Sequence, residues 1–341
     1  MLVGCYAPHP QTGAPCGDGA CPGDLVCSPA TNTCELSSTI DGAVDGMVID
    51  GCTPQAEICG DGIDQDCDGV DPVCVANDGA DGAIDVSAGG TFTVDMRYAN
   101  DDASDADCGG IGGRDVFYKI VLPAQEIVYA DTFGSDFRTV VRVFPGKACS
   151  AIAGASPVCN HDACGGAQSQ LAGPLPAGTS CIVVDQDAAA ITGMLTLRVT
   201  RGGRDGASLG SNMQTYTGNS CTGTNVTNPG TSCAGGDTST AEDAGYYFTV
   251  CPAQTLKLDA STCVDATMTA FDTVIYLRKA GGNNLGCNDD ATTCTARPAR
   301  PTHADGSILT NVASVGPGLF WLTVDGYSGA CGAFRVDTNL R

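Results

Sequence analysis

Short runs of β-branched and aromatic residues dominate the chain beyond Cys74, and glycine, proline, aspartate and asparagine separate them. No stretch keeps a helical period over three turns. The clearest runs are Ile127–Tyr129, Thr139–Phe144, Leu195–Val199, Thr273–Leu277 and Phe320–Val324. Short strands punctuated by turn residues are typical of β-sandwiches, so the pattern predicts a mainly β fold built from antiparallel sheets.

The β-rich part of the chain repeats itself. Four landmarks recur in the same order: 115–124 matches 244–253, 137–143 matches 271–277, 159–162 matches 287–290, and 181–185 matches 321–325. Ordered matches of this kind indicate a duplicated domain. We therefore expect two antiparallel, jelly-roll-like β-sandwiches, at 76–200 and 211–341, joined by a linker at 201–210.

The chain before the sandwiches has a different character. Residues 1–35 contain a short start and a knob with four cysteines, 36–51 form an acidic linker that repeats Asp-Gly, and 52–75 form a loop rich in aspartate and cysteine. Four cysteines can staple a module too small for a hydrophobic core, and three pairings are open. The disulfide candidates in this region are Cys16, Cys21, Cys27, Cys34, Cys52, Cys59, Cys67 and Cys74.

The charge balance excludes some partners. Lysine and arginine number 16 against 39 acidic residues, which gives a net charge of −23. Such a chain repels nucleic acid and anionic lipid and attracts cations. The 21 cysteines indicate an oxidising, extracytoplasmic compartment. Zinc is the alternative use of the cysteines, but three histidines and no paired CxxC motif argue against it.

The odd number of cysteines has two consequences. Leu2-Val-Gly-Cys5 resembles a bacterial lipobox, and lipidation of Cys5 would leave 20 cysteines to pair. This resemblance implies a secreted or outer-membrane, cell-surface lipoprotein that touches the membrane only through its N-terminal anchor. The two sandwiches contain five and seven cysteines, so either a bridge crosses their boundary or some thiols stay free.

The acidic loop has the spacing of a calcium loop. Asp64, Asp66 and Asp68 alternate and Gly69 follows them, so several carboxylates can point at one hard cation. Position twelve of an EF-hand would be Val75 instead of glutamate, so other acids must complete the shell. The predicted calcium ligands are Asp61, Asp64, Asp66, Asp68, the carbonyl of Val70, and Asp71. The alternatives are a solvated acidic loop or a copper site, and copper is disfavoured because the loop lacks histidine and methionine.

The repeats resemble the bacterial pre-peptidase C-terminal domain, most clearly at Phe271-Asp-Thr-Val, Cys287-Asn-Asp-Asp and Val324-Asp-Gly-Tyr. The resemblance implies β-sandwiches of the kind attached to secreted enzymes and surface proteins. It adds a possible second metal site at Asp272, Asn288, Asp289, Asp290 and Asp325, although these residue types also stabilise turns. The first repeat has Arg138 and His161 at the positions of Asp272 and Asp289, so we expect no cation there.

The acidic loop carries a resemblance of its own. Glu57-x-Cys59 followed by Asp64-x-Asp66-Cys-Asp-Gly69 is similar to the Cys/Asp-rich metal-binding repeat of surface lipoproteins from myxobacteria and their relatives. It is also similar to the calcium loops of thrombospondin type 3 repeats. Both resemblances imply a metal ion, with calcium the expected one.

Candidate catalytic chemistry is sparse. Gly206-Ala-Ser-Leu-Gly210 matches a nucleophile motif, but Ser-Asn-Met-Gln follows it instead of a helix. Trp321 lies in an apolar run and is predicted to pack in the core. We expect a non-enzymatic, secreted or cell-surface calcium-binding protein whose sandwiches bind an unknown protein or polysaccharide surface. The alternatives are a secreted hydrolase or its accessory subunit, and a copper-binding surface protein.

Overall fold

The computed structural model describes the following residues: 14–16, 21, 25–28, 32–36, 54–55, 58–67, 69–103, 108, 112–187, 193–204, 206–230, 233, 240–263, 269–294 and 306–341. The chain divides into two compact units, Met1–Pro72 and Val73–Arg341. Cys5, Cys52 and Asp68, which carry predicted roles, lie outside the described residues. Among the residues that are described, no helix has both the length and the apolar character needed to cross a membrane.

The first unit contains a small antiparallel sheet held by disulfides. Its strands are β1 (Ala14–Pro15), β2 (Leu25–Ser28) and β3 (Thr33–Leu36), in the order β1-β3-β2. Cys16 is bonded to Cys27 and Cys21 to Cys34. The structure thus selects one of the three possible pairings, and all four cysteines are engaged in disulfides instead of a zinc site.

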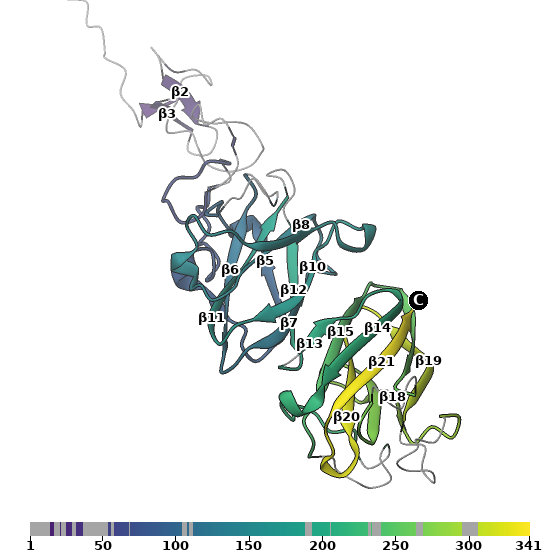
Figure 1. The fold of residues 1–341 in the computed structure, drawn as a ribbon. Coiled ribbons are helices and arrows are strands. Elements are labelled where there is room, and N and C mark those ends of the chain that lie inside the picture. Colours follow the sequence, from purple (N-terminus) through teal and green to yellow (C-terminus); the bar gives the residue numbers. More distant parts are fainter. Residues whose placement is uncertain are drawn as a thin grey trace, which may run out of the picture. The chain divides into compact units, whose positions relative to one another are not determined.

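The first sandwich opposes a four-stranded sheet, in the order β10-β7-β12-β5, to a five-stranded sheet, in the order β4-β6-β11-β8-β9 (Figure 1). Its strands are β4 (Ile84–Asp85), β5 (Gly90–Asp95), β6 (Asp115–Leu122), β7 (Glu126–Asp131), β8 (Thr139–Phe144), β9 (Val158–His161), β10 (Gln170–Leu175), β11 (Gly178–Gln186) and β12 (Met194–Arg201). Short 3₁₀ helices connect them: η2 (Ala80–Gly82), η3 (Met96–Tyr98), η4 (Cys149–Ala151) and η5 (Ala163–Gly165).

The second sandwich repeats this arrangement strand for strand. Its five-stranded sheet has the order β13-β15-β20-β17-β18 and its four-stranded sheet the order β14-β21-β16-β19. The strands are β13 (Gly206–Ser208), β14 (Asn212–Asn219), β15 (Ala244–Val250), β16 (Thr255–Ser261), β17 (Thr273–Lys279), β18 (Asn284–Asp289), β19 (Ile308–Val315), β20 (Gly318–Gly326) and β21 (Ala333–Leu340). The 3₁₀ helices are η6 (Ser220–Thr222) and η7 (Tyr327–Gly329). The two sandwiches therefore share one order of strands.

Each core lies between its two sheets because side chains alternate along every strand. In β6, Val116, Tyr118 and Ile120 are buried in the core of the first sandwich, whereas Phe117 belongs to a cluster on the other face of the sheet. Phe248 and Phe320 stack in the second core with ring centroids 5.6 Å apart. The same alternation places chemically active side chains on the outer faces of the five-stranded sheets.

All five strand runs expected from the sequence are strands, as part of β7, β8, β12, β17 and β20. Two details differ from the expectation. The two five-stranded sheets are antiparallel except at one edge each, where β4 pairs with β6 and β13 with β15 in parallel. Residues 201–210 are not simply a linker, because Gly206–Ser208 supply edge strand β13.

Trp321 is buried but does not lie in the core between the sheets. It is 5% exposed and clusters with Leu319, Ile127 and Tyr129, while its ring stacks on Tyr247 at 5.9 Å between centroids. Gly206 packs so closely that a Cβ atom there would lie 2.5 Å from the indole. The expected packing of Trp321 in a hydrophobic core is therefore confirmed, and the alternation of β20 places it in a cluster separate from the one between the two sheets.

Candidate functional site: acidic clusters at one end of each sandwich

A buried hydroxyl network fixes the chain before β8 in the first sandwich. The Oγ1 atoms of Thr132 and Thr139 lie 2.6 Å apart, and the amide of Ser169 donates to Thr132 Oγ1 at 2.8 Å. All three side chains are fully buried. Since buried hydroxyl groups are stable only when they are paired, the network holds the position of Arg138, the residue before β8.

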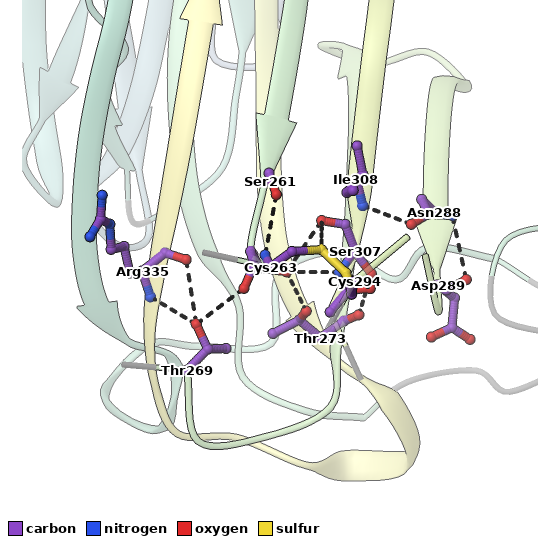
Figure 2. The surroundings of a disulfide bond; sticks show 12 residues. Ser261, Cys263, Thr269, Thr273, Asn288, Asp289, Cys294, Ser307, Ile308 and Arg335 are labelled. Carbon is purple, nitrogen blue, oxygen red and sulfur yellow. Dashed lines mark hydrogen bonds between the residues drawn. A yellow bond between two sulfur atoms is a disulfide. The ribbon is translucent and has the colours of Figure 1, made fainter. Parts of the chain in front are cut away.

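The second sandwich contains the same network. Thr262 and Thr273 lie 2.7 Å apart through their Oγ1 atoms, and the amide of Ser307 donates to Thr262 Oγ1 at 2.9 Å. Thr273 and Ser307 appear together in Figure 2. The residue that the network positions before β17 is Asp272, so Asp272 and Arg138 occupy equivalent places.

Three carboxylates meet at this end of the second sandwich. Asp272 precedes β17, Asp289 ends β18 and Asp290 follows it, and one oxygen from each lies within 4.8 Å of the others. Asp272 and Asp289 are half-buried and Asp290 is exposed. Three like charges at this separation repel one another, and hard divalent cations prefer such oxygen ligands. The donor set therefore fits a calcium-type ion.

The first sandwich has a guanidinium group at the equivalent place. Arg138 forms ion pairs with Asp162, which corresponds to Asp290, and with Asp187 at 2.6 Å. Asp162 and Asp290 share left-handed φ values of 57° and 58°. At this end the first sandwich therefore has an arginine among its carboxylates, whereas the second has an aspartate at the position of that arginine.

Asn288, a predicted ligand, has a structural role. Its Oδ1 accepts the amide of Ile308 at 2.7 Å, and Asn160 accepts the amide of Gln170 at 2.9 Å in the first sandwich. Figure 2 shows Asn288 turned toward Ile308, while the carboxylate of Asp289 points away. Because the same bond occurs in the repeat with Arg138, Asn288 ties two strands together.

Asp325, the last predicted ligand, is not in the three-carboxylate group. It is fully buried on β20 beside Asp243, which precedes β15. The hydroxyl of Tyr276 lies 3.3 Å from Asp325 Oδ2. Burial raises the pKa of Asp243. The five candidate residues of the second sandwich therefore separate into a three-carboxylate group, a strand tie and a buried acid pair.

The first sandwich has a matching buried pair with one added charge. Asp115 and Asp185 stand opposite each other in the register of β6 and β11, and both are fully buried. Arg142, whose side chain is 1% exposed, forms an ion pair with Asp185. Burial raises the pKa of Asp115 to about 7 and that of Asp185 to about 9, and Arg142 opposes both shifts.

The acidic loop is folded by its own carboxylates. Asp71 accepts the amides of Gly60 and Gly62 at 2.7 and 2.6 Å, and Asp64 accepts the amide of Gly69 at 2.8 Å. Asp61 accepts the amide of the residue two positions later at 2.8 Å. These bonds are typical of aspartate in tight turns. Gly69 has a φ of 92°, which a residue with a Cβ rarely adopts.

The predicted ligands of the loop are only partly placed. Among the described residues of the loop, which omit Asp68, no three carboxylates lie within reach of one ion. Val70 is 59% exposed, and Asp66 lies in the same turn. Cys59, Cys67 and Cys74 are disulfide-bonded. Calcium at this loop remains a prediction.

The candidate nucleophile motif does not form a strand-to-helix elbow. Ser208 lies in edge strand β13, which pairs in parallel with β15, and its side chain is exposed. His161 is the histidine that the described residues contain, and it contacts Asp162 at 3.2 Å. This motif therefore lacks the geometry that activates a serine.

Sequence reasoning missed the buried charges. Arg142 interrupts the apolar run of β8, and Tyr276 occupies the equivalent position in β17, opposite Thr323 as Arg142 is opposite Val183. The sequence did contain a signal for this, namely a charged residue in the middle of an apolar strand. The role of that residue can be explained only when the acidic residue that faces it is known.

No family model matches the chain, and no curated protein matches it in sequence. Among solved structures it is similar to the pre-peptidase C-terminal domain of collagenase from Bacillus anthracis, with a TM-score of 0.23, 14% identity, and coverage of 40% of this chain and 95% of that one. The CUB1-EGF-CUB2 region of human MASP-1/3 gives a TM-score of 0.19, 9% identity, and coverage of 74% and 99%. The ANX2 ectodomain from Arabidopsis thaliana gives a TM-score of 0.20 and 11% identity, with coverage of 73% of this chain and 88% of that one. These similarities are too low to assign a function.

The fold and the cysteines define the class of protein. The chain is a mainly β protein with two sandwich repeats and many disulfides. Disulfides persist in oxidising compartments, so this is an extracytoplasmic protein.

Proposed function

We propose that this protein is a non-catalytic, extracytoplasmic calcium-binding protein whose second sandwich holds the ion at Asp272, Asp289 and Asp290. The two sandwiches would present a binding or adhesive surface to a protein or polysaccharide. If Cys5 is lipidated, the lipid would hold the protein at a cell surface.

The observation that carries the proposal is the exchange of Arg138 for Asp272. In the first sandwich the guanidinium balances Asp162 and Asp187. In the second, the same turn supplies a further carboxylate next to Asp289 and Asp290. A divalent cation in the second sandwich would take the place of the arginine.

The ligand chemistry favours calcium over transition metals. Carboxylate oxygens suit hard cations, whereas copper prefers imidazole and thioether ligands. Three carboxylates leave several positions of a calcium shell to water or backbone carbonyls. Extracellular sites of this kind bind calcium with dissociation constants of about 10⁻⁴ to 10⁻³ M.

The acidic loop is a second candidate for the same ion. Asp61, Asp64 and Asp71 already fold it by accepting backbone amides. Calcium would neutralise the remaining repulsion and turn an acidic spacer into a fixed joint. This binding would be separate from binding in the second sandwich, so variants can distinguish the two.

Calorimetric titration of the chelator-stripped, oxidised, full-length protein with calcium tests the proposal, with magnesium and copper(II) as comparison ions. We expect saturable calcium binding that loses one equivalent in Asp272→Arg, which installs the arginine of the first sandwich. Asp64→Ala combined with Asp66→Ala would remove the loop contribution only.

A matched pair of variants controls for general charge effects. Asp290→Asn should weaken calcium binding, whereas Asp162→Asn, at the equivalent position of the first sandwich, should leave it unchanged. Equal effects of the two changes, or an unaltered stoichiometry in Asp272→Arg, would rule out the site. Tight binding of copper in preference to calcium would instead support the alternative of a copper-binding surface protein.

A further inference from the structure

A pocket lined by two arginines and the indole of Trp321 lies on the face of the second five-stranded sheet that points away from the core. Arg278 of β17 and Trp321 of β20 stand opposite each other in the register of the two strands. Arg201, at the end of β12, and Gly203 also line the pocket. Its volume is 280 Å³, which suits a small ligand of about one ring.

Arg278 is held in place without using all of its donors. Its Nε and Nη2 atoms donate to Asn284 Oδ1 at 3.2 and 2.9 Å, and Nη2 also donates to the carbonyl of Asn228 at 2.9 Å. The guanidinium lies 4.7 Å from the centroid of the Tyr276 ring. Within the described part of the chain, Nη1 has no acceptor and Arg278 forms no ion pair. An arginine fixed in this way is preorganised to bind an anion.

The other charges around the pocket leave Arg278 as its uncompensated cation among the described lining residues. Arg201 is already balanced, because its Nε and Nη2 atoms donate to the two carboxylate oxygens of Glu126 at 2.7 and 2.6 Å. The buried acids Asp243 and Asp325 do not line the pocket, and the hydroxyl end of Tyr276 contacts Asp325. One free positive charge matches a ligand with one negative charge.

The shared fold does not require a charge at this position. Cys181 stands opposite Phe144 in the first sandwich, as Trp321 stands opposite Arg278 in the second. Phe144 and Cys181 belong to an apolar cluster, and a disulfide joins Cys181 to Cys149. The first sandwich thus fills the place with apolar groups, so Arg278 is explained better by a ligand than by the packing of the sheet.

The net charge of the chain restricts the ligand further. A protein with a net charge of −23 repels a polyanion, so the occupant carries a single negative charge. The guanidinium fork fits a carboxylate. Trp321 and Ala280 offer apolar surface to the C–H groups of a ring, and Gly281 and Gly282 let hydroxyl groups approach the backbone. A sugar ring with one carboxylate combines these features.

We propose that this pocket binds a sugar acid with one carboxylate, either free or as the terminal residue of a neutral glycan. The carboxylate accepts hydrogen bonds from Nη1 of Arg278, and the ring lies against Trp321 and the glycine backbone. The inference rests on the binding role proposed for the sandwiches and names a ligand class for it. It does not involve calcium, so the two proposals can fail separately.

Titration of the oxidised, full-length protein with sodium glucuronate tests the inference. Trp321 is the one tryptophan of the chain and lines the pocket, so its emission reports occupancy, and calorimetry measures the same binding. The buffer contains chelator, because a sugar acid can also bind calcium. We expect saturable binding of glucuronate that weakens as salt is added, and no binding of glucose.

A second titration identifies the source of the sugar acid. A neutral oligosaccharide that ends in one glucuronate should bind as well as the free acid or better, and tighter binding would indicate a glycan end. Equal binding of glucose, equal binding of acetate, or preferred binding of a short glutamate peptide would overturn the proposed ligand class. No binding of any of these probes would overturn the site.

Two variants compare arginines of the same sandwich. Arg278→Gln keeps a donor for Asn284 but removes the charge, so glucuronate binding should weaken about 10- to 100-fold. Arg335→Gln makes the same change at an arginine that pairs with Asp337 on the other sheet, and it should leave binding unchanged. Unaltered circular dichroism spectra would show that both variants fold. Equal binding by Arg278→Gln and the parent would contradict the proposal.

Gly281 offers a matched test of charge inside the pocket. Its φ is 72°, a conformation that aspartate and asparagine tolerate, and no atom lies within 4 Å of the place of a Cβ. Gly281→Asp adds a carboxylate that repels the ligand, whereas Gly281→Asn has the same shape and no charge. We expect loss of glucuronate binding only in Gly281→Asp. The same affinity in both variants would show that the pocket does not select an anion.

Discussion

Cys164 of the first sandwich is bonded to Cys251 of the second. The other assigned bridges of the sandwiches each lie within one repeat: Cys108–Cys159, Cys149–Cys181, Cys221–Cys331, Cys233–Cys287 and Cys263–Cys294. Counts of five and seven cysteines require a crossing bridge if no thiol is free, and this disulfide supplies it. The odd cysteine of each repeat thereby joins the two sandwiches covalently.

Replacing both members of this bridge should loosen the connection without unfolding either sandwich. A disulfide that closes a long loop contributes about 2–5 kcal/mol, mostly by restricting the unfolded chain, and this one spans 87 residues. We expect Cys164→Ser with Cys251→Ser to lower the free energy of unfolding by that amount and to leave the far-UV circular dichroism spectrum unchanged. Denaturant titration measures the loss.

The buried bridge Cys149–Cys181 is the control, because its loss should also disturb the packing of the first sandwich. Equal stability of the parent and the Cys164/Cys251 double variant would show that the crossing bridge contributes nothing.

Asp115→Asn should flatten the pH dependence of the first sandwich. The folded protein holds the Asp115 proton up to a pKa of about 7, whereas the unfolded chain releases it near 3.8. Stability therefore falls as the pH rises from about 4 to about 7, by up to about 4 kcal/mol for this group. The amide oxygen can still accept the amides of Asp102 and Ala103.

The measurement is the denaturation midpoint of parent and variant at pH 4.5, 6 and 7.5. Asp81→Asn, at an exposed position, should keep the parental profile. A parental profile in Asp115→Asn would mean that this carboxyl group is ionised throughout.

Arg142→Leu should destabilise the first sandwich to a similar extent at pH 5 and at pH 8. The guanidinium is a buried hydrogen-bond donor to Asp185 and to the carbonyl of Ala103, and each buried group left unsatisfied costs about 1–3 kcal/mol. The pKa of Asp185 is about 9 even beside Arg142, so this carboxyl group is protonated at both values of pH. Urea denaturation at pH 5 and pH 8 measures the cost and its independence of pH.

The surface ion pair of Arg97 with Asp95 is the comparison, since Arg97 is 59% exposed. Arg97→Leu should leave the denaturation midpoint almost unchanged at either pH, because water screens an exposed ion pair. A similar small loss in Arg142→Leu would show that the buried pair adds no stability.

Gly206→Ala should disturb the packing of Trp321. The new Cβ would lie 2.5 and 2.8 Å from two carbon atoms of the indole, so the ring or edge strand β13 must move. Overpacking of this kind costs about 1–3 kcal/mol. We expect a shifted tryptophan emission maximum and a lower denaturation midpoint, whereas Ala207→Ser, at an exposed position of the same strand, should change neither.

The amino-acid pattern by itself determined the fold class and its duplication. Runs such as Thr139–Phe144 and Phe320–Val324 became strands because β-branched and aromatic side chains fill a pleated, half-buried surface. Ordered landmarks predicted two copies, and the cysteine parity left either a crossing bridge or free thiols. All of these follow from local chemistry or from counting.

Tertiary structure alone decided which acidic residues act together. Asp289 and Asp290 meet Asp272 across two strands, whereas Asp325, which the sequence analysis grouped with them, faces Asp243 in a buried pair. The alternation of β20 and the register of its neighbours set that division. The effect of a buried charge depends on the groups that face it. The exchange of Arg142 for Tyr276 could therefore be explained only when the fold showed which carboxyl groups lie opposite these two side chains.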